Sequence, residues 1–87
     1  MRQALVVGNW KMNGSRASVA ALLEALRGGL EGISTELAVC PTHVHLDQAL
    51  GLCEGSALSV GAQDCSAMES GAYTGEVSAP MIADMGC

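Results

Sequence analysis

The stretch ALVVGNWKMNGS, residues 4–15, joins a buried-looking apolar run to the start of a helical pattern. Its first four residues show no polar alternation, which is typical of a parallel strand covered on both faces, and we predict that strand over residues 3–8. The turn that follows carries one cation, Lys11, and two side-chain amides, Asn9 and Asn13. Ligands of α/β folds bind where strands end and such turns begin, so this turn is the candidate site.

The side chains of this turn suit the recognition of an anion. Lys11, the only lysine of the chain, is a compact positive charge on a flexible stem that can pair with a phosphate or a developing oxyanion. Asn9 can hydrogen-bond to an oxygen or orient Lys11. On spacing alone, a lysine in a polar turn can equally be solvated, and both interpretations stay open at this point.

Size and composition exclude several classes of function. The chain has 87 residues, of which 49% are hydrophobic and 15% charged, as expected for one small globular domain. Its net charge of −5 argues against nucleic acids and anionic membrane surfaces as partners. No apolar run reaches the length of a membrane span and no signal peptide is recognisable, so we expect a cytoplasmic protein with reduced thiols.

The cysteines and histidines do not predict a metal site. The four cysteines follow no zinc-binding spacing. His43 and His45 are two positions apart, so on a helix they face different ways, and surface or capping roles are favoured over ligation.

The rest of the chain alternates strand and helix patterns. Ser15 is predicted to cap the first helix, and residues 37–40 and 57–62 are predicted strands on either side of a second helix that starts near residue 42. The predicted buried faces are Val19, Leu22, Leu23, Leu26 and Leu30 for the first helix and Leu46, Ala49, Leu50 and Cys53 for the second.

A long stretch without helical period, residues 63–77, follows the third predicted strand, and loops of this length are often functional. Ser78 and Pro80 then open a short helix that is predicted to bury Met81, Ile82 and Met85. The βαβαβα order predicts a parallel α/β sheet, and three such strands leave two open edges.

Three motifs, in the right order and at the right spacing, resemble the triosephosphate isomerase family. GNWKMNG (residues 8–14) resembles its first βα loop, GAQD (61–64) the end of its third strand, and GAYTGEVS (71–78) its long third loop. The resemblance covers the whole chain. It implies the first three βα units of a (β/α)8 TIM barrel, an α/β fold that typically takes about 250 residues, so residues 1–87 would be a single, partial domain.

The family's reaction interconverts dihydroxyacetone phosphate and glyceraldehyde 3-phosphate through an enediolate, in glycolysis and gluconeogenesis, with no metal or organic cofactor. By position, Asn9 and Lys11 match the substrate-binding pair, and the resemblance implies that Lys11 has the catalytic role of balancing the enediolate charge. The family forms homodimers through its third loop. Thr74 matches the tip residue of that loop, between Tyr73 and Gly75, and Met12 matches a position in the pocket that receives it.

The chain departs from the family pattern in what it omits. The segments that carry the catalytic histidine, the glutamate base, the mobile lid and the phosphate-gripping glycine loops have no counterpart, so residues 1–87 alone are expected to be inactive. Two alternatives from other classes remain: a non-catalytic interaction module that uses the long loop, and a different phosphate-binding βα domain that shares only the lysine turn.

Overall fold

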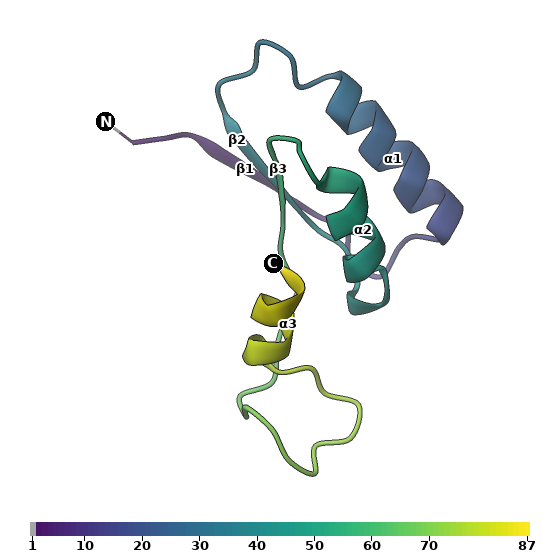
Figure 1. Cartoon of the computed structure of the whole chain (residues 1–87), viewed down its shortest axis with the longest axis vertical. Coiled ribbons are helices and arrows are strands. Elements are labelled where there is room, and N and C mark those ends of the chain that lie inside the picture. Colours follow the sequence, from purple (N-terminus) through teal and green to yellow (C-terminus); the bar gives the residue numbers. More distant parts are fainter. Residues whose placement is uncertain (1) are drawn as a thin grey trace.

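A three-stranded parallel sheet with two helices on one face forms the body of the chain (Figure 1). The computed structural model describes residues 2–87. The sheet has the order β1 (Leu5–Asn9), β2 (Glu36–Cys40) and β3 (Leu58–Val60), connected through α1 (Arg16–Gly28), a short 3-10 turn (His43–His45) and α2 (Leu46–Cys53), and a final helix, α3 (Ala79–Met85), follows a long loop. This alternation confirms the predicted α/β class and matches the first βα units of a TIM barrel.

The strands are in register at their carboxyl ends, which brings the turns after β1, β2 and β3 together. Asn9, the last residue of β1, lies opposite Cys40, the last residue of β2. Val39 of β2 lies opposite Val60 of β3. Residues that follow the three strands are therefore neighbours in space, although they are far apart along the chain.

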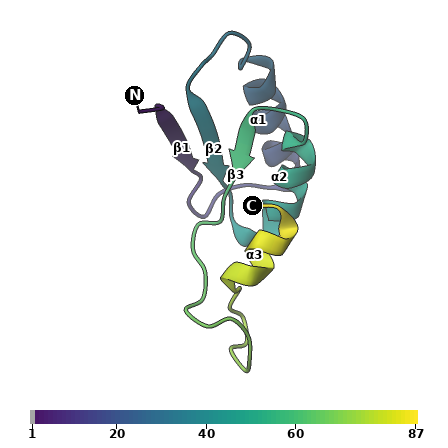
Figure 2. The ribbon, with the colours of Figure 1, turned by 60° about the vertical axis from the view of Figure 1, so that its left-hand side comes forward.

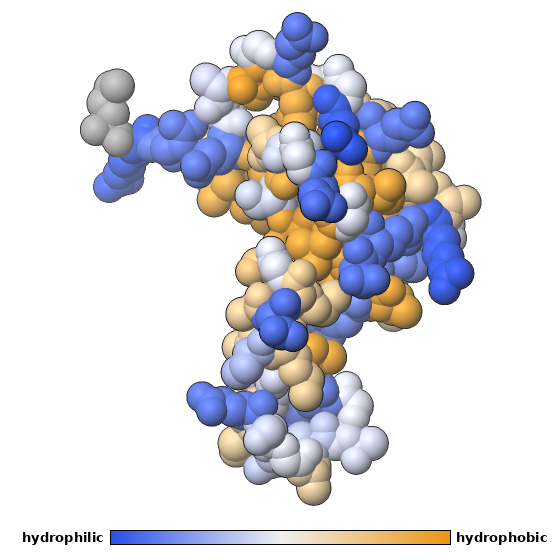
Figure 3. Space-filling view, viewed as in Figure 1, coloured by the Kyte–Doolittle hydropathy of each residue, from blue (hydrophilic) through white to orange (hydrophobic). Residues whose placement is uncertain are grey.

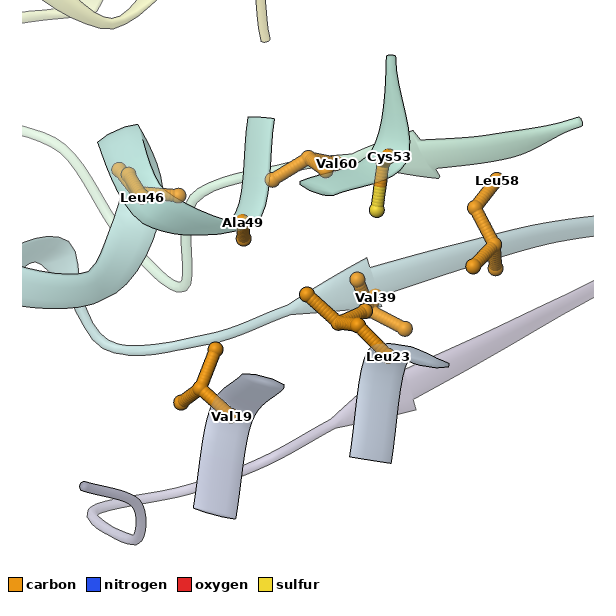
Figure 4. Close-up of a cluster of buried hydrophobic side chains, with 8 residues drawn as sticks. All are labelled: Val19, Leu23, Val39, Leu46, Ala49, Cys53, Leu58 and Val60. Atoms are coloured by element: carbon orange, nitrogen blue, oxygen red, sulfur yellow. The ribbon is translucent and has the colours of Figure 1, made fainter. Parts of the chain in front are cut away.

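The hydrophobic core lies between the helices and the strands β2 and β3 (Figure 4). Its buried members come from α1 (Val19, Leu23), β2 (Val39), α2 (Leu46, Ala49, Cys53) and β3 (Leu58, Val60). The predicted buried face of α2 is confirmed for these three positions. The prediction was wrong for Leu22 of α1, which is 45% exposed because it borders an open depression beside Trp10.

The first strand is not covered on both faces as its apolar run predicted. Leu5, Val6 and Val7 are 57%, 58% and 49% exposed. Figure 2 shows the reason: the helices lie on one side of the sheet, and β1 forms its edge. Within residues 2–87 no β1 side chain belongs to the buried cluster, so this strand presents an apolar surface without a covering element.

Residues 61–78, here called the long loop, extend away from the body toward the bottom of Figure 1. A backbone hydrogen bond of 2.7 Å from Ser66 to the carbonyl of Val77 closes the neck of this loop. Space-filling colours in Figure 3 show the strongest apolar surface over the sheet and helices, and paler residues over the loop. The long loop is thus a projection with little apolar surface of its own.

The helix α3 begins and ends as its sequence predicts. The hydroxyl of Ser78 accepts a hydrogen bond from the backbone N–H of Met81 at 3.2 Å, and Gly86 ends the helix in the left-handed conformation. Ile82 is buried, but Met81 and Met85 are 57% and 39% exposed, against the prediction. The helix lies beside the neck of the long loop, below the main core, so only one of the three residues predicted to be buried is fully covered.

Candidate functional site

The turn between β1 and α1, residues 10–15, forms the candidate site and is here called the lysine loop. Lys11 has a φ of 56°, the left-handed region that side chains other than glycine rarely adopt. Such a conformation costs about 1–3 kcal/mol and persists only where the surroundings hold it. The strained residue is the candidate catalytic cation, at the carboxyl end of β1 as expected.

Asn9 stabilises this conformation locally. Its side-chain Oδ1 accepts a hydrogen bond of 2.9 Å from the backbone N–H of Lys11. The asparagine therefore orients the lysine backbone, one of the two roles that its chemistry allowed. Its Nδ2 has no hydrogen-bond partner within the described part of the chain and stays free to donate to a ligand oxygen.

Gln63, in the segment that follows β3, holds the lysine loop from the other side. Its Nε2 donates to the carbonyl oxygen of Lys11 at 2.7 Å and to the carbonyl oxygen of Cys40 at 2.8 Å. The backbone N–H of Trp10 also donates to Cys40 O, at 3.1 Å. One side chain thus joins the ends of all three strands around Lys11.

The remainder of the lysine loop is fixed by Asn13 and Gly14. The side-chain amide of Asn13 donates to the carbonyl of Trp10 at 2.9 Å. Gly14 has a φ of 128°, and a Cβ there would lie 3.3 Å from Val19 Cγ2 and 3.4 Å from His45 Cδ2. Glycine suits this position because side chains rarely adopt this backbone conformation and because a Cβ would force these neighbours to shift.

The charge of Lys11 is not neutralised by this scaffold. Its side chain is exposed, and across residues 2–87 no carboxylate lies within ion-pair distance of it. An exposed ammonium on a backbone that is held in place can meet an anion without first breaking an ion pair. The arrangement is therefore able to bind a phosphate or to stabilise a developing oxyanion.

A depression of about 380 Å³ lies next to the lysine loop but does not contain its cation. Its lining is mostly apolar and comes from Trp10, Asn13, Gly14, Ser18, Val19 and Leu22. Neither Asn9 nor Lys11 contributes to it. The depression is thus an uncovered part of the apolar surface beside β1, separate from the anion-binding groups.

The two histidines lie at the end of β2, where they contact the other loops. His43 Nε2 lies 2.9 Å from the backbone oxygen of Asp64 and 3.2 Å from its Oδ1, while the ring of His45 packs near Gly14. In the described residues, 2–87, no group of three or more His, Cys, Asp or Glu side chains is placed to hold a metal ion. Both histidines therefore make structural contacts.

The long loop carries its three candidate residues on a hydrogen-bonded turn. The backbone N–H of Glu76 donates to the carbonyl of Tyr73 at 3.0 Å, and Gly75 within this turn has a φ of 89°. Thr74 and Gly75 are exposed, and Tyr73 is 44% exposed. A glycine at this position allows the tight turn that presents Thr74.

The structure brings some predicted residues together and leaves others apart. Lys11 and Met12 lie on the lysine loop next to Asn9, the last residue of β1, and Met12 is 91% exposed. Tyr73, Thr74 and Gly75 lie on the long loop. Sequence reasoning placed Gln63 in a motif but gave it no role; a polar side chain directly after a predicted strand was the available signal.

Comparison with known proteins identifies the family. The family model described as Triosephosphate isomerase matches residues 4–87. This chain belongs to the triosephosphate isomerase family. The curated triosephosphate isomerases of Nitrosococcus oceani and Delftia acidovorans are 54% and 55% identical to it, over 100% and 99% of the chain. The triosephosphate isomerase of Dechloromonas aromatica is 49% identical over the whole chain.

The match covers only part of each relative. The chain spans about a third, 35%, of the length of these triosephosphate isomerases.

Within residues 2–87 no helix is both long enough and apolar enough to cross a membrane. The apolar strand β1, uncovered here, lies at the edge of a sheet that the family closes into a barrel.

Proposed function

We propose that residues 1–87 form the amino-terminal part of a cytoplasmic triosephosphate isomerase and supply its lysine loop. Family membership supports this proposal, and one observation carries it: the exposed ammonium of Lys11 just after β1 has no ion-pair partner among residues 2–87, and its backbone is held by Asn9 and Gln63. The substrate is a small phosphorylated triose, and no metal or organic cofactor takes part.

In the proposed reaction Lys11 acts by charge. A carboxylate base elsewhere in the barrel removes a proton from one carbon of dihydroxyacetone phosphate and returns it to the neighbouring carbon, through an enediolate. The Lys11 ammonium stabilises the negative charge of the phosphate and of the enediolate oxygen. Asn9 donates to a substrate oxygen through Nδ2, because its Oδ1 already accepts the hydrogen bond from Lys11.

The long loop is proposed to dock into a second copy of the chain. Support comes from the exposed turn at Tyr73, Thr74 and Gly75, and from Met12, an apolar side chain that is 91% exposed on the lysine loop. Covering the Met12 side chain with the docked loop would remove its apolar surface from water, which favours association. The complete protein is thus proposed to be a homodimer, with Met12 in the receiving pocket.

The isomerase proposal is tested with two proteins. One is residues 1–87 alone; the other, here called the completed enzyme, joins residues 1–87 to the remaining segment of the Nitrosococcus oceani enzyme. Each is assayed for conversion of glyceraldehyde 3-phosphate to dihydroxyacetone phosphate. We expect turnover only from the completed enzyme. A folded completed enzyme without activity, or comparable turnover by residues 1–87 alone, would overturn the proposal.

A further inference from the structure

His43 connects the end of β2 to the start of the long loop. Its Nε2 lies 2.9 Å from the backbone oxygen of Asp64 and 3.2 Å from the carboxylate Oδ1 of the same residue. Both atoms are acceptors, so Nε2 carries a hydrogen and donates it. The backbone of Asp64 is therefore held in place by a side chain from a different loop.

Of these two contacts, the one to the backbone oxygen matters more. The Asp64 side chain is 83% exposed, and exposed ion pairs contribute little because water and salt screen them. A hydrogen bond to a backbone oxygen instead fixes the orientation of a peptide group. Here that peptide group lies one residue beyond Gln63, the residue that holds the lysine loop.

The contacts form a continuous series that ends at the candidate catalytic cation. His43 holds Asp64, the neighbouring Gln63 holds the carbonyl of Lys11, and Asn9 accepts from the N–H of Lys11. Because Lys11 has a left-handed backbone conformation, it depends on such external support. Movement of residues 63 and 64 would release one of its two anchors.

We propose that His43 is a positioning residue for Lys11. It acts through the backbone of Asp64 and the side chain of Gln63, and it makes no contact with substrate. This inference rests on the proposed isomerase function for its kinetic consequence. Its structural consequence, an ordered lysine loop, is measurable whether or not Lys11 is catalytic.

The test compares three variants of the completed enzyme. His43→Phe keeps a ring and removes the donor, His43→Gln replaces the ring by an amide that can donate, and Asp64→Ala removes only the exposed carboxylate. Each variant is measured for kcat, KM, secondary structure by circular dichroism, and amide hydrogen exchange of the peptide covering residues 8–14. A general loss of stability would speed exchange in many peptides, whereas a local effect on the lysine loop would speed exchange mainly in this one.

We expect His43→Phe to lower kcat by about tenfold or more, since small misplacements of a catalytic group have effects of this size. It should also speed exchange in residues 8–14 while circular dichroism stays unchanged. His43→Gln should recover much of both, and Asp64→Ala should resemble the unmodified enzyme. The inference is overturned if His43→Phe is unfolded, if its kcat and exchange are unchanged, or if Asp64→Ala is equally damaging.

Failure of the inference differs from failure of the proposed function. If Lys11→Ala leaves isomerase activity intact, the proposed role of Lys11 is wrong, yet faster exchange in His43→Phe would still support the positioning role. If Lys11→Ala abolishes activity while His43→Phe changes neither kinetics nor exchange, the proposed function stands and His43 does not position Lys11.

Discussion

The side-chain amide of Gln63 lies 2.7 Å from the carbonyl oxygen of Lys11, although 52 positions separate the two residues along the chain. The same amide reaches Cys40 O at 2.8 Å, so the ends of β1, β2 and β3 are tied together at this one side chain. Without the amide, the carbonyl of Lys11 would need water or another donor, whereas Cys40 O also accepts from the N–H of Trp10. The position of the candidate cation therefore depends on the third strand as well as the first.

The first prediction concerns this amide. Gln63→Met keeps the length of the side chain and removes both hydrogen bonds, so we expect the left-handed Lys11 backbone to relax. In the completed enzyme kcat should fall by about tenfold or more, with faster amide exchange in residues 8–14. Gln48→Met is the matched control. Gln48 lies on α2, and its side-chain amide donates a similar hydrogen bond of 2.8 Å to a backbone carbonyl, that of Arg16 on α1.

Equal kinetics and exchange in Gln63→Met and Gln48→Met would contradict the role given to Gln63. The control matters because any lost hydrogen bond to a backbone carbonyl costs about 0.5–1.5 kcal/mol in stability. Only the lysine-loop readouts separate a local effect from that general cost.

The second prediction concerns the tip of the long loop. Thr74→Glu places a charge where the proposed docking pocket is packed, and an unpaired buried charge is strongly unfavourable. We expect sedimentation velocity of the completed enzyme to show a dimer that dissociates at higher protein concentration than the unmodified one. Ala57→Glu, at an exposed position ahead of β3, adds the same charge away from the loop and should leave the dimer unchanged. A Thr74→Glu dimer as stable as the control would rule out docking through this turn.

The third prediction concerns a thiol in the core. Burial raises the pKa of the Cys53 thiol above its ordinary value of 9.0, and the nearby Arg27 guanidinium only partly offsets this. The folded state therefore favours the neutral thiol. The resulting stabilisation is fully present below the ordinary pKa and is lost as the pH rises through the raised pKa.

We expect the unfolding free energy of the completed enzyme, measured in urea at fixed protein concentration, to fall as the pH rises above about 9. Cys53→Ala should show a shallower fall, whereas Cys65→Ala, which removes an exposed thiol, should keep the original slope. Identical slopes for the two variants would refute the explanation.

Sequence patterns predicted the elements of this fold because the relevant signals are local. Ser15 and Ser78 both accept hydrogen bonds from the first turn of their helices, and the apolar spacing of α2 identified Leu46, Ala49 and Cys53 as buried. Capping and helical periodicity involve residues three or four positions apart. Such relationships can be read directly from a single chain.

Burial and long-range contacts could not be read in the same way. The apolar run of β1 correctly indicates a strand, but its exposure depends on which other elements lie over the sheet within residues 2–87. The contacts of Gln63 with Lys11 and of His43 with Asp64 join loops distant in sequence. Nothing in the spacing of these residues records the register of the strands that brings them together.

The central claim is that Lys11 supplies the positive charge of a triosephosphate isomerase site. The direct measurement is kcat/KM for glyceraldehyde 3-phosphate in the completed enzyme with Lys11→Ala, beside Arg16→Ala, which removes a neighbouring exposed cation from the first turn of α1. We predict that kcat/KM falls by about 100-fold or more for Lys11→Ala, with unchanged circular dichroism, and by little for Arg16→Ala. A folded Lys11→Ala enzyme that keeps the activity of the Arg16→Ala control would contradict the claim.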